Sequence, residues 1–215
     1  MAILIFPTES DFESFFEGLK GWKLLSTPGA ALWIHEEETK FICVVSGQGK
    51  VDCALSCYAA MNLRPNEPFF LLGAATALDS VLRIGDVFAV RCCTEADYHS
   101  KAGAGKNPCY TPDSNLARRI NEFLPDLTWV HLLSGDEDVF EPTRKEQLAQ
   151  RYAGQAWTWE GAGFGRFLRR FKAKGIEIRC ILEGAEEGAL SLKEMKDRRM
   201  AFFPSFKKKI LEILF

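Results

Sequence analysis

The stretch FICVVSGQGKVDCALSCYAAM, residues 41–61, decides the fold class. It begins with an apolar run over residues 41–45, continues through a glycine-rich turn, and passes into a helical pattern over residues 50–61. An apolar run without alternation is typical of a strand buried on both faces of a mostly parallel or mixed sheet. A strand, a tight turn and a helix in this order indicate an α/β fold.

The same alternation continues through the rest of the chain. We expect further strands at residues 3–6, 31–34, 69–73, 87–93, 129–133 and 176–182, and further helices at residues 10–19, 114–124, 143–152, 160–174 and 205–214. No repeat and no linker-like change of composition interrupts this order. We therefore predict a single domain over residues 1–215, built as a mixed sheet with helices on both faces.

The charge balance excludes several classes of partner. The chain has 27 Lys and Arg residues against 29 Asp and Glu residues, so its overall field does not attract nucleic acid or an anionic membrane. No segment approaches the roughly 18 consecutive apolar residues of a membrane span. Residues 1–6 have the pattern of a buried strand and lack the basic region of a signal peptide. We predict a soluble protein that binds a small molecule.

The cysteines and histidines point to a reducing compartment and to no metal. Seven cysteines, an odd number that lies mostly in apolar runs, indicate buried free thiols and a cytoplasmic protein. His35, His99 and His131 have no spacing typical of metal ligands, so we predict neither a metal site nor a cofactor.

Two glycine- or alanine-rich segments follow predicted strands. SGQGK at residues 46–50 could present backbone N–H groups to a phosphate or an oxygen-rich ligand, or it could be a tight turn that needs glycine for its backbone angles. LLGAATALD at residues 71–79 places small side chains where a ligand or another element approaches closely. The carboxyl ends of strands are where open α/β sheets bind ligands.

Two other segments carry carboxylates. In WTWEGAG, residues 157–163, Glu160 is either a favourable charge at a helix start or a clamp for two ribose hydroxyls beside an aromatic ring. In RCILEGAEE, residues 179–187, Glu183 ends an apolar strand and could protonate a leaving group. The alternative is a solvated acidic turn formed by Glu183, Glu186 and Glu187.

Taken in order, these segments resemble the purine nucleoside phosphorylase and nucleosidase superfamily, which includes methylthioadenosine/S-adenosylhomocysteine nucleosidase and futalosine hydrolase. Residues 46–50 resemble its S-G-x-G-K turn, and residues 73–86 resemble its G-x-A-G-x-L…G-D segment. Residues 134–136 resemble its S-G-D, and residues 159–162 resemble its M-E-G-A. The resemblance implies the superfamily's α/β fold.

The resemblance also implies cleavage of the N-glycosidic bond of a ribonucleoside, through a transition state with positive charge in the sugar. Glu160 matches the glutamate that binds the ribose hydroxyls, and Trp159 takes the place of the methionine under the sugar. Val139 and Phe140 fall near the base-binding segment. Glu183 falls where the family has the catalytic aspartate that activates the base.

Three departures and one further match bear on the chemistry. Glu183 is one methylene longer than aspartate, and Ala74 and Thr76 change the small residues beside the sugar. Because Ala74 replaces the serine that binds phosphate in phosphorylases, it favours water as the nucleophile. In nucleosidases an acidic residue near the N-terminus positions that water; Asp11 is the nearest match, with Glu9 beside it. Both could instead be ordinary first-turn carboxylates.

We therefore expect a nucleosidase that hydrolyses a purine-type ribonucleoside, of the methylthioadenosine/S-adenosylhomocysteine or futalosine kind. The alternatives are a nucleoside-binding relative without catalysis, because Glu183 departs from the family's aspartate, and a phosphate-dependent phosphorylase. By the same resemblance Tyr98 could cover the substrate, and the protein would be a homodimer.

Overall fold

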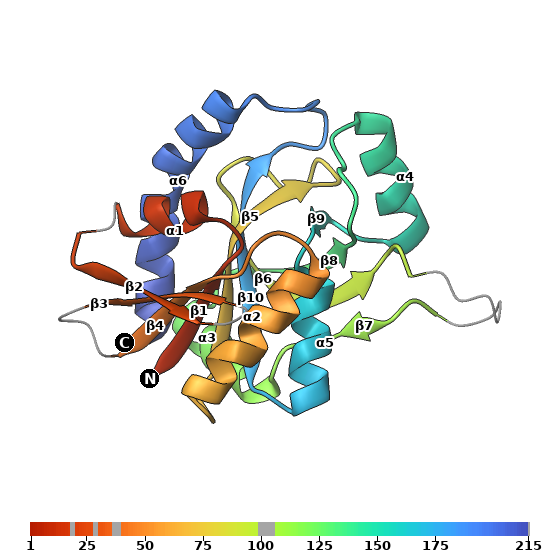
Figure 1. The fold of residues 1–215 in the computed structure, drawn as a ribbon. Helices are drawn as coiled ribbons and strands as arrows, with labels where there is room; N and C mark the ends of the chain where they lie inside the picture. Colours follow the sequence, from red (N-terminus) through yellow and green to blue (C-terminus); the bar gives the residue numbers. More distant parts are fainter. Residues whose placement is uncertain (18–19, 28–29, 36–39, 99–105, 215) are drawn as a thin grey trace.

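The computed structural model describes residues 1–17, 20–27, 30–35, 40–98 and 106–214 (Figure 1). The helices are α1 (Glu9–Phe16), α2 (Lys50–Leu63), α3 (Ser114–Phe123), α4 (Pro142–Tyr152), α5 (Gly161–Phe171) and α6 (Leu192–Leu214). The strands are β1 (Ala2–Phe6), β2 (Trp22–Thr27), β3 (Ala30–His35), β4 (Phe41–Val45), β5 (Phe69–Ala77), β6 (Val87–Glu95), β7 (Cys109–Tyr110), β8 (Thr128–Ser134), β9 (Ala156–Thr158) and β10 (Gly175–Glu183).

The strands form one mixed sheet, which confirms the predicted fold class. β1 pairs in parallel with β4 and β5, and β3 and β2 extend the β4 side in antiparallel pairing. On the other side the sheet closes on itself, because β5 pairs with both β9 and β10, and the pairs β10–β6, β6–β8 and β8–β9 complete the ring. The predicted sheet did not include this closure.

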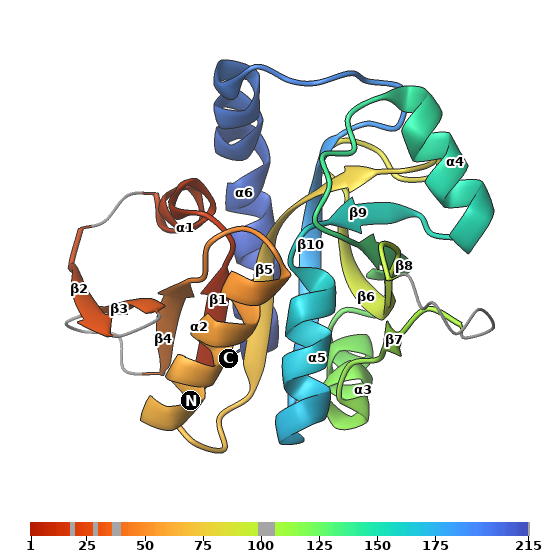
Figure 2. The same cartoon turned by 45° about the vertical axis from the view of Figure 1, so that its right-hand side comes forward.

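Helices cover both faces of the sheet. α2 and α5 lie side by side on one face, where their apolar residues pack on β1, β4 and β5 (Figure 2). α1, α3 and α6 pack on the opposite face. α4 lies over the β8 and β9 region, where Leu148 packs with Leu133 and Trp157. No described helix has the length and apolar character required to cross a membrane.

Several predicted boundaries were wrong. The short strands β7 and β9 and the edge strand β2 were not predicted, because two or three residues carry no periodicity and β2 is partly polar. α6 begins at Leu192 and continues through Pro204, whereas the predicted helix began at residue 205. A proline inside a helix costs about 3 kcal/mol; complete burial of Phe203 and Phe206 on either side of it offsets that cost.

The first helix begins one residue earlier than expected. Thr8 is its N-cap: its Oγ1 accepts a hydrogen bond from the backbone N–H of Asp11 at 3.0 Å. This cap fixes Asp11 in the first turn, with its side chain only 2% exposed. Ser10, the first residue of the predicted helix, is exposed.

None of the seven cysteines forms a disulfide bond. Contrary to the prediction of buried thiols, two of them are not buried. Cys109 is exposed on β7, and Cys92 is half-buried on β6. Burial, together with the neighbouring Cys109, raises the pKa of the Cys92 thiol to about 11.

Candidate active site

The predicted site residues line one cleft. It has a cavity volume of about 240 Å³ and opens at the carboxyl ends of β1, β5 and β10, where open α/β sheets bind ligands. Its lining includes eight residues that the sequence analysis named: Asp11, Ala74, Thr76, Val139, Phe140, Trp159, Glu160 and Glu183. Gln48 of the glycine-rich turn also lines it, as do Arg199 and Met195, which were not predicted.

Glu160 is a buried carboxylate held by a buried arginine. It is the N-cap residue of α5, but its side chain makes no cap hydrogen bond. Arg179 donates to its Oε2 at 3.2 Å and to Glu177 Oε1 at 2.7 Å. All three side chains are almost fully enclosed. Burial raises the pKa of Glu160 to about 7; Arg179 lowers it and Glu177 raises it.

Ala74 and Thr76 lie within β5, which continues to Ala77; the prediction that this strand ends at residue 73 was wrong. The backbone carbonyl of Ala74 accepts a hydrogen bond from Arg179 at 3.3 Å. Gly73 is required here, because a Cβ would lie 2.8 Å from the Pro7 ring and 2.9 Å from the Arg179 guanidinium. Thr76 pairs in register with Glu183. The small residues therefore make room for the arginine as well as for the cleft.

Glu183 is paired with a lysine that the sequence analysis missed. Lys145, on α4, is fully buried and donates to Glu183 Oε1 at 2.6 Å. It also donates to the backbone carbonyls of Gly184 and Glu187 at 2.9 and 2.8 Å. Burial raises the pKa of Glu183, and the lysine opposes that rise. No sequence signal marked Lys145, since it stands among the polar residues of an otherwise ordinary helix.

The turn after Glu183 is an ordered ion-pair network. Arg198 of α6 donates to both carboxylate oxygens of Glu187, at 2.7 Å each. Glu187 in turn accepts the N–H of Gly184 at 2.6 Å, and Arg198 holds its pKa at about 2. Of the three acidic residues in this turn, only Glu186 is exposed. The interpretation of a solvated acidic turn is wrong for Glu183 and Glu187.

Asp11 and Glu9 are separated by the structure. Asp11 is buried at the cleft and accepts a hydrogen bond from Arg199 Nε at 2.7 Å. Glu9 is exposed and is absent from the cleft lining. Tyr98 is 41% exposed and does not line the cleft either, and its neighbour His99 lies outside the described residues. Asp11 is therefore the acidic residue of this segment that a ligand can meet.

The aromatic and base-side residues come from two segments joined by one serine. Ser134, at the end of β8, donates to the Trp159 carbonyl at 3.2 Å and accepts the Ala162 N–H at 3.0 Å. It thereby fixes the start of α5 beside the segment that leads to Val139 and Phe140. Val139 is buried, whereas Phe140 is 42% exposed.

Charged side chains of the protein bind the residues of the glycine-rich turn and the start of α2. Gly47 and Gly49 have φ angles of 82° and 93°, as a tight turn requires. Asp136 accepts the backbone N–H of Lys50 at 3.1 Å, at the start of α2. The Lys50 ammonium donates to Asp97 at 2.8 Å and to Glu95 at 3.2 Å. A carboxylate thus occupies the place where a phosphate would bind.

Comparison with known proteins places these features in a family. No family model matches the chain. A futalosine hydrolase of Thermus thermophilus is 31% identical over 199 residues, which cover 84% of this chain and 82% of that protein.

Solved structures show the same fold. The methylthioadenosine/S-adenosylhomocysteine nucleosidase of Neisseria meningitidis, in complex with methylthio-immucillin-A, matches with a TM-score of 0.85 at 18% identity, over 99% of this chain and 97% of that chain. The futalosine hydrolase of Helicobacter pylori matches with a TM-score of 0.83 at 18% identity, over 99% of this chain and 96% of that chain.

The fold and the relatives together define a nucleosidase of the nucleoside phosphorylase/nucleosidase superfamily, and they confirm the resemblance that the motifs indicated. The chain belongs to the futalosine hydrolase family. It is an N-ribosyl hydrolase, which cleaves the N-glycosidic bond of a nucleoside with water.

Proposed function

We propose that the substrate is a purine-type ribonucleoside, with futalosine as the first candidate and methylthioadenosine and S-adenosylhomocysteine as the next. The observation that carries the proposal is the convergence of three carboxylates, Asp11, Glu160 and Glu183, from distant parts of the chain on one cleft. The relative that covers most of the chain is a futalosine hydrolase, which ranks futalosine first.

Glu160 binds the ribose hydroxyls in this proposal. Two vicinal hydroxyls can donate to one carboxylate, and these hydrogen bonds strengthen as positive charge develops in the sugar. Burial raises the pKa of Glu160 to about 7, so the unliganded carboxyl ionises less readily than an exposed glutamate does. Hydroxyl donors favour the ionised form, so substrate binding draws Glu160 into its charged state. Trp159 covers the sugar beside it.

Glu183 assists the leaving base. Its raised pKa favours the protonated carboxyl that a general acid needs. Because Lys145 occupies Oε1, Oε2 is the oxygen that can donate to a ring nitrogen of the base. Val139 and Phe140 supply apolar surface for the base.

Asp11 holds the attacking water. The arginine that donates to Asp11 Oδ1 fixes the orientation of the carboxylate, so that its other oxygen can accept a hydrogen bond from water. Ala74 and Thr76 form the floor of the cleft on β5.

The negative charge of the cleft favours water over phosphate as the nucleophile. A phosphate dianion in this cleft would face Asp11, Glu160 and Glu183, while the nearby Arg179 and Arg199 are already paired with carboxylates. Ala74 offers no hydroxyl to phosphate, and Asp136 covers the start of α2. These features support hydrolysis.

We also propose that the protein is a cytoplasmic homodimer. Seven unpaired cysteines support a reducing compartment. An apolar stripe on α2, formed by Val51, Leu55 and Tyr58 at 67%, 54% and 44% exposure, supports an interface between two copies. Light scattering of the wild type and of Leu55→Glu tests the dimer: the wild type should have twice the mass of the chain, and the variant should be monomeric.

The substrate is tested by measuring free base chromatographically. The purified protein is incubated with futalosine, methylthioadenosine, S-adenosylhomocysteine, inosine and adenosine, each with and without phosphate. We expect base release from futalosine that does not depend on phosphate. Release only with phosphate would contradict hydrolysis. Saturable binding of a nucleoside without release would favour the alternative of a binding protein that has lost catalysis.

A further inference from the structure

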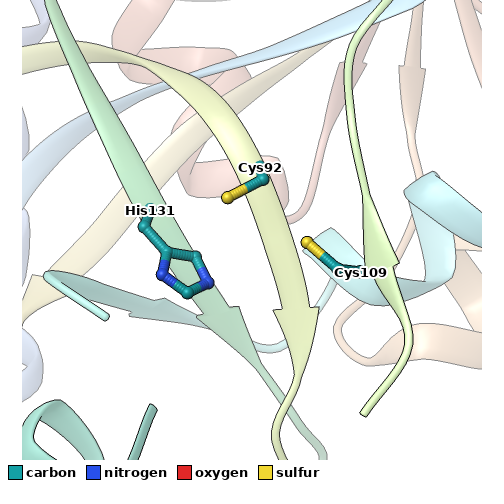
Figure 3. Close-up of side chains that lie close together, drawn as sticks. All are labelled: Cys92, Cys109 and His131. Carbon is teal, nitrogen blue, oxygen red and sulfur yellow. The ribbon is translucent and has the colours of Figure 1, made fainter. Parts of the chain in front are cut away.

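A second cluster of chemically active side chains lies away from the nucleoside cleft. Cys92 on β6, Cys109 on β7 and His131 on β8 stand on three neighbouring strands (Figure 3). Cys92 is the register partner of His131, and Cys109 is the partner of Thr94, two residues along β6. The two sulfurs and an imidazole nitrogen lie within 4.8 Å of one another. None of the three lines the cleft.

The orientation of His131 is fixed by its own hydrogen bonds. Nδ1 lies 3.0 Å from the carbonyl oxygen of Ala153, which only accepts, so Nδ1 carries the proton. Nε2 then has the free lone pair, and it accepts the Thr94 hydroxyl at 2.8 Å. A neutral imidazole whose other nitrogen donates to a backbone carbonyl is the usual state of a metal-binding histidine.

We propose that Cys92, Cys109 and His131 bind a zinc ion through two thiolates and one imidazole. Two soft sulfurs with one imidazole are a donor set that selects zinc among the common divalent ions. Tetrahedral zinc takes sulfur at about 2.3 Å and nitrogen at about 2.0–2.1 Å. The distances between the ligand atoms must therefore shorten by about 1 Å when zinc binds. On binding, the metal replaces the Thr94 hydroxyl at Nε2.

The surroundings leave room for a fourth ligand. Cys109 is exposed, and Cys92 and His131 are half-buried, so a water molecule can complete the tetrahedron. The bound ion joins β7, which has only two residues, to β6 and β8. The sequence-based expectation of no metal considered histidine spacing alone; the sheet brings together cysteines and a histidine that are far apart in sequence.

Cobalt substitution tests the site. The full-length protein, kept reduced and freed of metal by a chelator, is titrated with Co²⁺ and then with Zn²⁺. We expect one cobalt ion per chain, an absorption band of thiolate-to-cobalt charge transfer, and displacement of the band by one equivalent of zinc. Elemental analysis of protein expressed with zinc should find about one zinc ion per chain.

Matched variants assign the ligands. The charge-transfer band should be lost in Cys109→Ser, which changes an exposed side chain, and in His131→Gln. It should remain in the control Cys53→Ala, which removes a buried thiol elsewhere. Circular dichroism checks that each variant is folded, and the wild-type titration stands even if one of them is not. Three results would overturn the proposal: cobalt binding without the thiolate band, a band that persists in Cys109→Ser, or a Cys92–Cys109 disulfide in protein isolated under reducing conditions.

Discussion

The two ends of the nucleoside cleft hold their carboxylates in different ways. Glu160 is paired with Arg179, which lies on β10 in the centre of the sheet and has no exposed surface. Glu183 is paired with Lys145, which lies on the peripheral helix α4. The side chain of Glu183 is 13% exposed. The first pair belongs to the core; the second joins a helix to a turn.

This difference explains how the site can hold a glutamate at position 183, where the family pattern has an aspartate. Arg179 is bound by Glu160, Glu177 and the backbone carbonyl of Ala74, so a change at either glutamate removes a partner from a buried charge. The partner of Glu183 is a long lysine side chain, whose other two hydrogen bonds go to loop carbonyls, so the lysine can follow a carboxylate that is one methylene longer. The Glu160 carboxylate is therefore fixed by the sheet, and the position of the Glu183 carboxylate is adaptable.

The largest effect is expected from Glu183→Gln. An amide cannot give a proton to the leaving base, so kcat should fall on the order of 10²- to 10⁴-fold with a smaller change in KM. Steady-state kinetics of base release measures both constants. An unchanged kcat would assign the protonation of the base to another group.

Glu160→Gln should lower kcat/KM on the order of 10²- to 10³-fold, because it removes charge stabilisation of the sugar in the transition state. The matched control is Glu177→Gln, which also takes a carboxylate from Arg179 but does not line the cleft. The control should lose stability while keeping most of its activity. Equal losses of activity in both variants would indicate that Glu160 contributes to activity only by pairing with Arg179.

Stability should fall as pH rises from about 4.5 to about 7, because Glu160 has a pKa near 4.5 when unfolded and about 7 when folded. Over this interval the folded state holds a proton that the unfolded state has lost, so raising the pH favours unfolding. Chemical denaturation at several pH values measures the slope. The slope should be smaller in Glu160→Gln, and an equal slope would contradict the assignment.

Lys145→Met is expected to have the smallest effect. It leaves Glu183, whose side chain is 13% exposed, without its cation, which costs about 1–3 kcal/mol of stability. The pKa of Glu183 should rise further, so the decline of kcat at high pH should move to higher pH. The pH profile of kcat separates this outcome from a purely structural loss, which would lower kcat equally at every pH.

The sequence predicts the fold class and the members of the cleft, but not how their charges are paired. Apolar runs locate the long buried strands, and the motif order identifies Glu160 and Glu183. Arg179, Lys145 and Arg199 were missed, because a cation that pairs with a distant carboxylate leaves no local pattern. The ring closure of the sheet was missed for the same reason, since it depends on pairings between distant strands.

We propose that one cleft holds a nucleoside with its ribose at Glu160 and its base at residue 183. A crystal structure of the Glu183→Gln variant with bound futalosine tests this placement. We expect ribose hydroxyls within hydrogen-bond distance of the Glu160 carboxylate, and the base between residue 183 and the Val139–Phe140 segment. A nucleoside bound in the reverse direction, or at the glycine-rich turn of residues 46–50, would contradict it.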